Sequence, residues 1–287
     1  MGRLKRSERV AAIIRMLVDR PSVVFPLTVF ADRFDAAKST ISEDIALIRQ
    51  SFEELGMGRV ETLAGAAGGV RFFPHRTIEE SHQIALQLCH RLSEPERLLP
   101  GGFLYMTDII FSPAWAMQIG EIFATRFRDS EPQYVLTVET KGIPLALMTA
   151  RALNVPLVIS RRDNRVTEGS SVSINFISGS SGRIQTMSLP RRAVPVGARA
   201  LIVDDFMKGG GTARGMVDLL AEFQAAVVGI AVLVETMDPQ MKMVRDYVSL
   251  VELEAVDEVT HRIRLRPGSR LFGSAKGATA QRGDARG

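Results

Sequence analysis

The 287-residue chain has almost no cysteine, since Cys89 is the only one. A single thiol excludes an internal disulfide framework and is too few for a cysteine-rich zinc site. The longest uncharged apolar run, residues 223–234, is well short of the roughly 20 apolar residues that span a bilayer. Glu8 interrupts the basic start of the chain before the apolar core of a signal peptide could form. We therefore expect a cytoplasmic protein with no membrane contact.

Net charge is also small. The chain carries 36 Lys and Arg against 32 Asp and Glu, a formal charge of +4, which by itself does not indicate a nucleic-acid binder. The distribution is more informative, because residues 1–75 hold 11 basic and 9 acidic side chains and residues 261–287 hold 7 and 1. The middle of the chain is acidic, with 18 basic and 22 acidic side chains. Basic ends around an acidic middle are a reason to look for a DNA-binding unit near one end.

Helical periodicity dominates the first part of the chain. Apolar residues recur at spacings of three and four over residues 10–18, after Ser7, which could cap a helix. A shorter apolar set at helical spacing follows over residues 27–34. A third helix is predicted over residues 41–55, with Gly56 where the residue after a helix end is often glycine.

A hairpin is predicted directly after these helices. Residues 59–63 and 70–73 are rich in strand-forming side chains and flank a tip of glycine and alanine. Three helices followed by a hairpin form a winged helix-turn-helix, in which the third helix reads DNA and the hairpin is the wing. We therefore predict a winged-helix DNA-binding domain over residues 1–75 and a second domain over residues 76–287.

The third helix begins with short polar side chains that can contact phosphates or base edges, and basic residues of the wing and the N-terminal arm could bind phosphates. The candidate DNA contacts are Lys38, Ser39, Thr40, Ser42, Arg3, Lys5, Arg6, Arg59 and Arg71. An alternative stays open, since winged helices also serve as dimerisation or protein-docking modules. Glu43 and Asp44 would moreover repel a phosphate backbone.

Strand and helix patterns alternate in the second domain, which indicates an α/β fold with a parallel, doubly wound sheet. A glycine- and arginine-rich tail from Gly268 is expected to fray. Arg262, Arg264 and Arg266 alternate as on one charged face of a strand. The predicted strands are 134–138, 155–160, 199–205, 227–235 and 249–256, and the predicted helices are 78–92, 144–153 and 212–223.

The most informative segment is residues 200–212, with the sequence ALIVDDFMKGGGT. An apolar strand ends in Asp204 and Asp205, crosses a glycine-rich turn and enters a helix near Thr212. Ligands of open α/β sheets bind at the carboxyl ends of the strands, and a glycine turn before a helix N-terminus suits an anion. Adjacent carboxylates would repel phosphate but suit a vicinal diol or Mg²⁺. The pattern thus predicts a ribose phosphate ligand, although two acids beside such a turn could also be incidental.

This segment resembles the phosphoribosyl-pyrophosphate (PRPP) motif of type I phosphoribosyltransferases. Residues 139–142, ETKG, resemble the pyrophosphate loop of that family, and Arg161 with Arg162 resembles the basic pair before its flexible loop, here residues 163–182. Tyr105 is a further candidate at the edge of the pocket or at a dimer interface. The complete candidate PRPP site is Asp204, Asp205, Phe206, Met207, Lys208, Gly209, Gly210, Gly211, Thr212, Thr140, Lys141, Gly142, Arg161, Arg162 and Tyr105.

A winged helix before such a domain, with the polar segments 167–170 and 178–181, resembles the purine operon repressors of Gram-positive bacteria. The resemblance covers all but the C-terminal tail. It implies a homodimeric repressor of purine biosynthesis genes that binds operator DNA and is released from it by PRPP, with Mg²⁺ accompanying PRPP and no prosthetic group or resident metal. Guanine-nucleotide alarmones such as ppGpp are a further ligand class that it implies.

Catalysis is a separate question. In hypoxanthine-type relatives an Asp four residues after the first acid handles the proton of the base, whereas Lys208 stands at that position here. A protonated lysine cannot accept a proton at neutral pH. Gly209 also replaces a threonine that is usual in the phosphate loop. We therefore expect a sensor rather than an enzyme, with a catalytically active purine phosphoribosyltransferase as the alternative.

Overall fold

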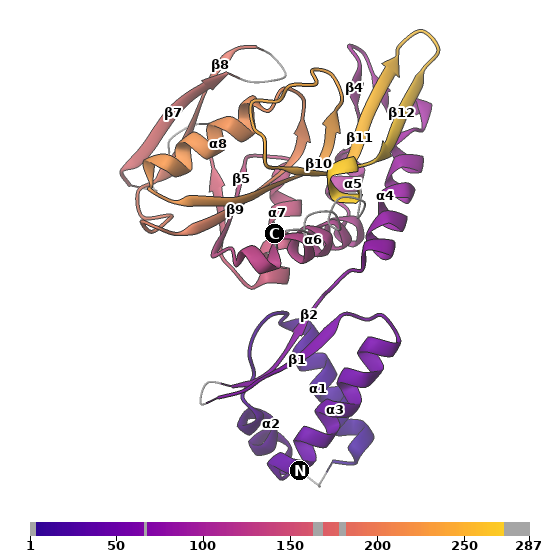
Figure 1. Ribbon diagram of the computed structural model, residues 1–287, viewed down its shortest axis with the longest axis vertical. Coiled ribbons are helices and arrows are strands. Elements are labelled where there is room, and N and C mark those ends of the chain that lie inside the picture. The colour runs from indigo at the N-terminus through magenta and orange to yellow at the C-terminus, as the bar shows by residue number, and fades with distance from the viewer. Residues whose placement is uncertain (1–3, 66–67, 163–168, 178–181, 273–287) are drawn as a thin grey trace, which may run out of the picture.

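The computed structural model describes residues 4–65, 68–162, 169–177 and 182–272. It consists of an N-terminal helical unit and a larger α/β domain, joined by the short segment between strand β2 and helix α4 (Figure 1). The predicted arrangement, three helices with a hairpin followed by an α/β domain, is confirmed. Within the described residues no helix combines the length and the apolar character needed to cross a membrane.

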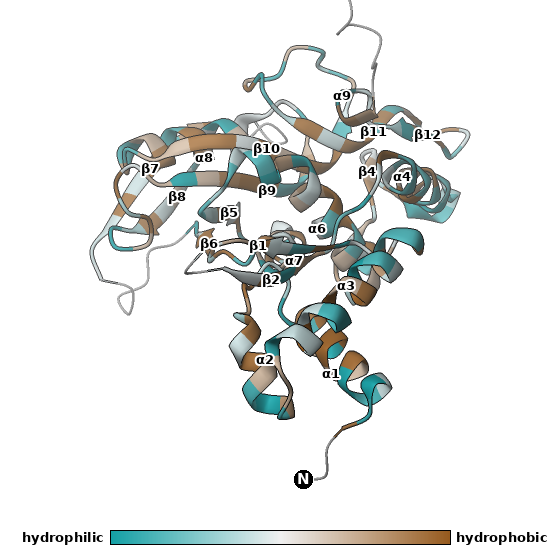
Figure 2. Ribbon diagram, turned by 60° about the horizontal axis from the view of Figure 1, so that its bottom comes forward, coloured by the Kyte–Doolittle hydropathy of each residue, from teal (hydrophilic) through white to brown (hydrophobic). Residues whose placement is uncertain are grey.

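The N-terminal unit has the predicted three helices and hairpin. Its core contains large apolar side chains such as Ile13, Phe30 and Ile48, all at most 1% exposed. Helices α1 and α3 alternate between hydrophobic and hydrophilic positions along their length, as amphipathic surface helices do (Figure 2). The elements are α1 (Arg6–Asp19), α2 (Leu27–Phe34), α3 (Lys38–Glu54), β1 (Arg59–Leu63) and β2 (Gly69–Phe73).

The helix starts differ from the prediction. Helix α1 begins at Arg6 rather than after Ser7, because the Glu8 carboxylate accepts a hydrogen bond from the Lys5 backbone N–H at 2.7 Å. Helix α3 begins at Lys38, so four of the residues predicted for DNA contact, Lys38, Ser39, Thr40 and Ser42, lie in its first turns. Gly56 follows its end with a φ of +64°, a left-handed conformation that favours glycine.

The α/β domain is built on a six-stranded sheet in the order β12-β11-β10-β9-β5-β6. All neighbouring pairs are parallel except β11 and β12, so the predicted parallel sheet is present with one antiparallel strand added at its edge. The cause is local, since the Asp257 side chain accepts hydrogen bonds from Val259 and Thr260 and closes a tight turn that returns the chain antiparallel. The strands are β5 (Tyr134–Val138), β6 (Leu157–Ser160), β9 (Arg199–Met207), β10 (Ala226–Thr236), β11 (Val248–Asp257) and β12 (Arg262–Pro267).

Four helices cover one face of the sheet, and a helix with a two-stranded hairpin covers the other. Residues alternate between the two faces along β9, because Leu201 and Val203 belong to one apolar core while Ala200 and Ile202 belong to the other. The first core includes α4 (Ile78–Leu92), α5 (Thr107–Ile110), α6 (Pro113–Phe127) and α7 (Gly142–Leu153); the second includes α8 (Gly211–Glu222), β7 (Ser171–Ile177) and β8 (Ile184–Pro190). Short elements complete the domain: η1 (Pro95–Arg97), β3 (Leu98–Leu99), β4 (Phe103–Leu104), η2 (Arg128–Ser130) and α9 (Ser269–Phe272).

The tail is ordered further than its composition predicts. Ser269 donates hydrogen bonds from its backbone N–H and its hydroxyl to the buried Glu252 carboxylate, and the ring of Phe272 meets that of His82 edge-on at 5.2 Å. A Cβ on Gly268 would lie 1.9 Å from the Ser249 carbonyl oxygen. The expected fraying from Gly268 is therefore wrong for residues 268–272, and residues 273–287 lie outside the described part of the chain.

The two domains contact each other directly. Phe73 at the end of the wing is buried against Ala124 and Ala152 of the α/β domain. The Ser22 hydroxyl donates a hydrogen bond to the Ala152 carbonyl oxygen at 2.6 Å, and Glu61 of the wing forms an ion pair with Arg128. Because Ala152 lies on α7, the helix that follows the predicted pyrophosphate loop also contacts the winged helix.

Candidate functional site

The predicted ligand residues surround a cavity of about 430 Å³ at the carboxyl ends of β5, β6 and β9. This is the edge at which open α/β sheets bind ligands. Cavity and motif therefore coincide. The lining residues are Val138, Glu139, Thr140, Lys141, Arg162, Asp204, Asp205, Phe206, Met207, Lys208, Gly210, Gly211, Thr212, Ala213 and Val232.

Two adjacent carboxylates form the acidic part of the cavity. Asp204 is buried, and its Oδ1 accepts a hydrogen bond from the Asp205 backbone N–H at 2.9 Å. Burial, followed by the neighbouring Asp205 carboxylate, raises the pKa of Asp204, and burial raises the pKa of Asp205. Buried carboxylates with raised pKa values gain from a partner that supplies positive charge or hydroxyl donors. A vicinal diol or a divalent cation has this chemistry.

The glycine turn after β9 presents a helix N-terminus to the same cavity. Gly210 has a φ of +81°, and α8 begins at Gly211, so the first N–H groups of this helix have no partner within it. Gly211 and Thr212 line the cavity. Unpaired N–H groups and the positive end of the helix dipole make this turn a site for a phosphate.

A second loop, residues 139–142, lies directly against the acid pair. A Cβ on Gly142 would be 2.3 Å from Thr137 Oγ1 and 2.9 Å from Asp204 Oδ1, so only glycine fits there. The Glu139 carboxylate accepts a hydrogen bond from the Arg162 backbone N–H at 2.8 Å, which connects this loop to the end of β6. Thr140 and Lys141 line the cavity with Arg162. The loop and the end of β6 thus place two cations, Lys141 and Arg162, at the same cavity as the carboxylates.

Some predicted ligand residues lie elsewhere. Arg161 is not among the lining residues, and its backbone pairs with Ser188 of β8. Gly209 and Gly142 belong to the two loops without lining the cavity. Residues 163–168 and 178–181 of the predicted flexible loop lie outside the described part of the chain.

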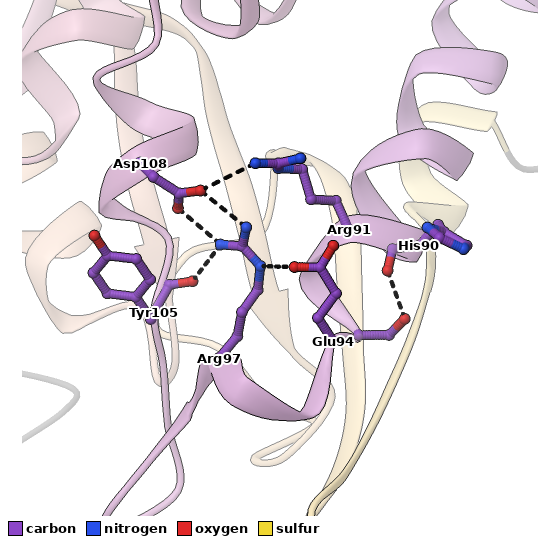
Figure 3. Close-up of polar contacts among 7 residues, drawn as sticks. His90, Arg91, Glu94, Arg97, Tyr105 and Asp108 are labelled. Atoms are coloured by element: carbon purple, nitrogen blue, oxygen red, sulfur yellow. Dashed lines mark hydrogen bonds and ion pairs between the residues drawn. The ribbon is translucent and has the colours of Figure 1, made fainter.

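Tyr105 is also separate from the cavity in this chain. It lies beside the buried Arg97, whose guanidinium donates hydrogen bonds to the Tyr105 carbonyl oxygen and to both Asp108 carboxylate oxygens. The Tyr105 ring is exposed and points away from this cluster (Figure 3). The hydrogen bonds from Arg97 lower the pKa of Asp108 to about 2. The cluster holds the segment between β4 and α5 in place.

Helix α3 presents the predicted DNA contacts on its outer surface. Lys38, Ser39 and Ser42 are exposed and Thr40 is half-buried. Asp44, which was expected to repel phosphates, is instead fully buried and forms ion pairs with Arg9 and Arg6. The expected repulsion is therefore wrong for Asp44, because this residue lies on the buried face of α3.

The remaining basic candidates are distributed over the winged helix. Arg59 and Lys5 are exposed, while Arg6 is exposed and paired with Asp44. Arg71 lies at the domain junction, where its Nε is 2.8 Å from the Glu61 carboxylate. Arg3 lies outside the described residues.

Residues of a later segment, which were not predicted, bind the backbone of the glycine turn. The Lys242 ammonium donates a hydrogen bond to the Lys208 carbonyl oxygen at 2.6 Å, and the Met243 N–H donates to the Gly209 carbonyl oxygen at 3.0 Å. Neither side chain lines the cavity. Because this segment is more than 30 residues from the turn and carries no motif, no signal in the sequence points to it.

Comparison with known proteins agrees with this arrangement. Residues 5–74 match the model of the bacterial purine repressor N-terminal domain, and residues 106–263 match that of the phosphoribosyl transferase domain. The purine biosynthesis transcriptional repressor PurR of Bacillus subtilis (strain 168) is 46% identical over 269 residues, covering 94% of each chain. The chain belongs to the bacterial purine repressor family.

Other members of this family differ in how they are described. The purine biosynthesis transcriptional activator PurR of Lactococcus lactis subsp. lactis is 39% identical over 266 residues, covering 93% of this chain and 98% of its own. Among solved structures, adenine phosphoribosyltransferase from Rhodothermus marinus has a TM-score of 0.51 at 22% identity and covers 60% of this chain and 99% of its own. At that identity the likeness shows the fold alone.

Proposed function

We propose that this protein is a DNA-binding repressor of purine biosynthesis genes and that PRPP is the inducer that weakens its binding to operator DNA. One observation carries the proposal: the acid pair, the glycine turn and the second loop converge on one cavity in a chain that begins with a winged helix. Its similarity to a transcriptional repressor of purine biosynthesis over nearly the whole chain supports the regulatory role.

Each part of PRPP has a matching group in the cavity. The 5′-phosphate would bind the N–H groups of the glycine turn and the N-terminus of α8. The ribose diol would lie against Asp204 and Asp205, and the diphosphate would lie against Thr140, Lys141 and Arg162. Mg²⁺ would enter with the diphosphate as part of the ligand, since hard oxygen donors from phosphate and carboxylate suit it. A guanine-nucleotide alarmone could use the same phosphate-binding groups.

Sensing without catalysis follows from the group next to the acids. Lys208 is exposed at the cavity, where a transferase of the hypoxanthine type has a carboxylate for the proton of the base. An ammonium group offers no such acceptor. The relatives over nearly the whole chain are described as regulators, which favours the same conclusion.

DNA would be read by α3 of a homodimer, with Lys38, Ser39, Thr40 and Ser42 toward the major groove. The winged helix has a net charge of only +2, so a larger positive surface would have to assist it. Lys141, Arg162 and Lys208 around the cavity are candidates for that surface. A bound PRPP would neutralise these cations, and DNA affinity would fall through lost electrostatic attraction, direct competition or both.

The test is a fluorescence-anisotropy titration of the protein on DNA from upstream of a purine biosynthesis operon of the same genome, at fixed salt, with and without PRPP and Mg²⁺. PRPP is expected to weaken DNA binding of the wild type. The double variant Asp204→Asn with Asp205→Asn keeps both side-chain shapes, and we expect it to bind DNA without responding to PRPP. An unchanged wild-type affinity in the presence of PRPP would refute the inducer model.

A further inference from the structure

The segment that crosses from β10 to β11 contacts the glycine turn through residues that do not line the cavity. The ammonium of Lys242 donates three short hydrogen bonds to backbone carbonyl oxygens, at 2.6 Å to Lys208, 2.6 Å to Thr236 and 2.7 Å to Pro239. A lysine ammonium has three donors, so these bonds use all of them. Lys242 therefore acts on the backbone rather than as a surface charge.

Two consecutive peptide units of the turn are held in this way. Lys242 binds the carbonyl oxygen of Lys208, and the Met243 N–H binds that of Gly209 at 3.0 Å. In a planar trans peptide the C=O and the following N–H point in opposite directions. With both carbonyls bound by this segment, the N–H groups of Gly209 and Gly210 point away from it, and Gly210 lines the cavity where a phosphate would bind.

The approach of this segment is close. A Cβ on Gly210 would lie 3.2 Å from the Met243 backbone nitrogen and 3.5 Å from Lys242 Cβ. The Lys242 side chain is half-buried between the turn and its own segment. The turn is thus held by contacts within the protein itself. A fixed array of donors binds an anion more tightly than one that must be ordered on binding.

We propose that Lys242 is a positioning residue of the phosphate-binding turn, which it prepares for the 5′-phosphate of a phosphoribosyl ligand. This role rests on the proposed function, because that ligand is the one whose phosphate would bind the turn. It predicts that the glycine turn and the pyrophosphate loop respond differently to the loss of Lys242. Loss of the ammonium should affect the glycine turn and leave the pyrophosphate loop, residues 139–142, unchanged.

The experiment compares Lys242→Met with wild type by calorimetric titration of ribose 5-phosphate and of inorganic pyrophosphate, each with Mg²⁺. Methionine has a similar length and no donor. We expect affinity for ribose 5-phosphate to fall by about tenfold or more, which is the effect of about 1.4 kcal/mol, while pyrophosphate affinity stays within about twofold. Arg245→Met, which removes an exposed cation from the same segment, is the matched control and should leave both affinities unchanged.

Chemical rescue separates positioning from a general structural role. Lys242→Cys treated with 2-bromoethylamine gains a thioether side chain that ends in an ammonium group and should regain affinity for ribose 5-phosphate. Cys89, the only native cysteine, is buried, and burial raises the pKa of its thiol to about 12, so it should resist alkylation. Equal loss of both ligands without rescue would overturn the positioning role, as would unchanged binding by Lys242→Met. Absence of binding to the wild type would instead refute the proposed function itself.

Discussion

The buried ion pair inside the winged helix allows a sharp test of how this domain is held together. Asp44 of α3 lies 2.5 Å from Nε of Arg9, whose side chain is only 9% exposed, and 3.1 Å from Nε of Arg6, whose side chain is 59% exposed. Substituting Asp44→Ala leaves the Arg9 guanidinium buried without a counter-charge. Breaking a buried pair in this way costs about 3–5 kcal/mol.

The two arginines should differ strongly. Arg6→Ala removes an exposed pair and should cost less than about 1 kcal/mol, because solvent screens it. The double variant Arg9→Met with Asp44→Leu removes both charges and replaces them with apolar groups, and such exchanges are often close to neutral. Its free energy of unfolding should therefore lie near that of the wild type, well above that of Asp44→Ala.

Hydrogen exchange of backbone amides in the full chain measures these differences domain by domain. Amides of α1 and α3 in Asp44→Ala should exchange at least about a hundredfold faster, since each factor of ten corresponds to about 1.4 kcal/mol, or lose protection completely. Amides of β10 in the other domain serve as the internal reference and should not change. An acceleration of less than tenfold in Asp44→Ala, or an effect of Arg6→Ala as large as that of Asp44→Ala, would refute the reasoning.

Three further predictions concern the α/β domain. Gly142→Ala places a methyl group 2.3 Å from Thr137 Oγ1. This overpacking should cost about 1–3 kcal/mol of stability, measured by thermal melting, and should lower PRPP affinity, measured by calorimetry. Adding Thr137→Ala to this variant should partly restore both stability and affinity. Burial raises the pKa of Asp204 above 3.8, so the stability of the wild type falls as the pH rises from 3.8 toward the folded-state pKa of this group. Asp204→Asn should therefore melt at a higher temperature than ligand-free wild type at pH 8, and this difference should disappear toward pH 4. The PRPP affinity of the variant should fall. The hydrogen bonds from Arg97 lower the pKa of Asp108 from 3.8 to about 2, so their stabilisation is present above pH 3.8 and is lost as the pH falls to about 2. The melting temperature of Asp108→Asn should therefore fall less on acidification than that of the wild type. An equal fall in both proteins would contradict this.

Prediction from sequence was most successful where the relevant physics is local. The strand over residues 199–205, the two acids and the glycine turn are consecutive in the chain, and apolar strand, turn and helix start each have a signal within a few residues. Local patterns are independent of how distant segments meet.

Predictions failed where contacts between distant segments place a side chain, or where a helix is buried around most of its circumference. Helix α6 was not predicted, because its apolar residues surround much of the helix and so lack a clear periodic stripe; even Gly120 is buried against the backbone of α7. The charge of Asp44 was assigned to the wrong face of α3, since only the docking of α1 shows where it points. Lys242 has no recognisable motif, and its role arises from three carbonyl oxygens brought together by folding.

The sequence alone was enough to predict a winged helix, an α/β domain and a turn suited to a sugar phosphate. Helix periodicity, strand alternation and glycine turns can each be recognised within a short stretch of chain. Folding decided which of those residues share a cavity, leaving Tyr105 and Arg161 outside it and bringing Glu139 and Arg162 together. It also decided which charges are buried, as with Asp44, and which remain at the surface. These outcomes depend on packing between segments far apart in sequence, where burial and hydrogen-bond geometry are set by partners that no local pattern specifies.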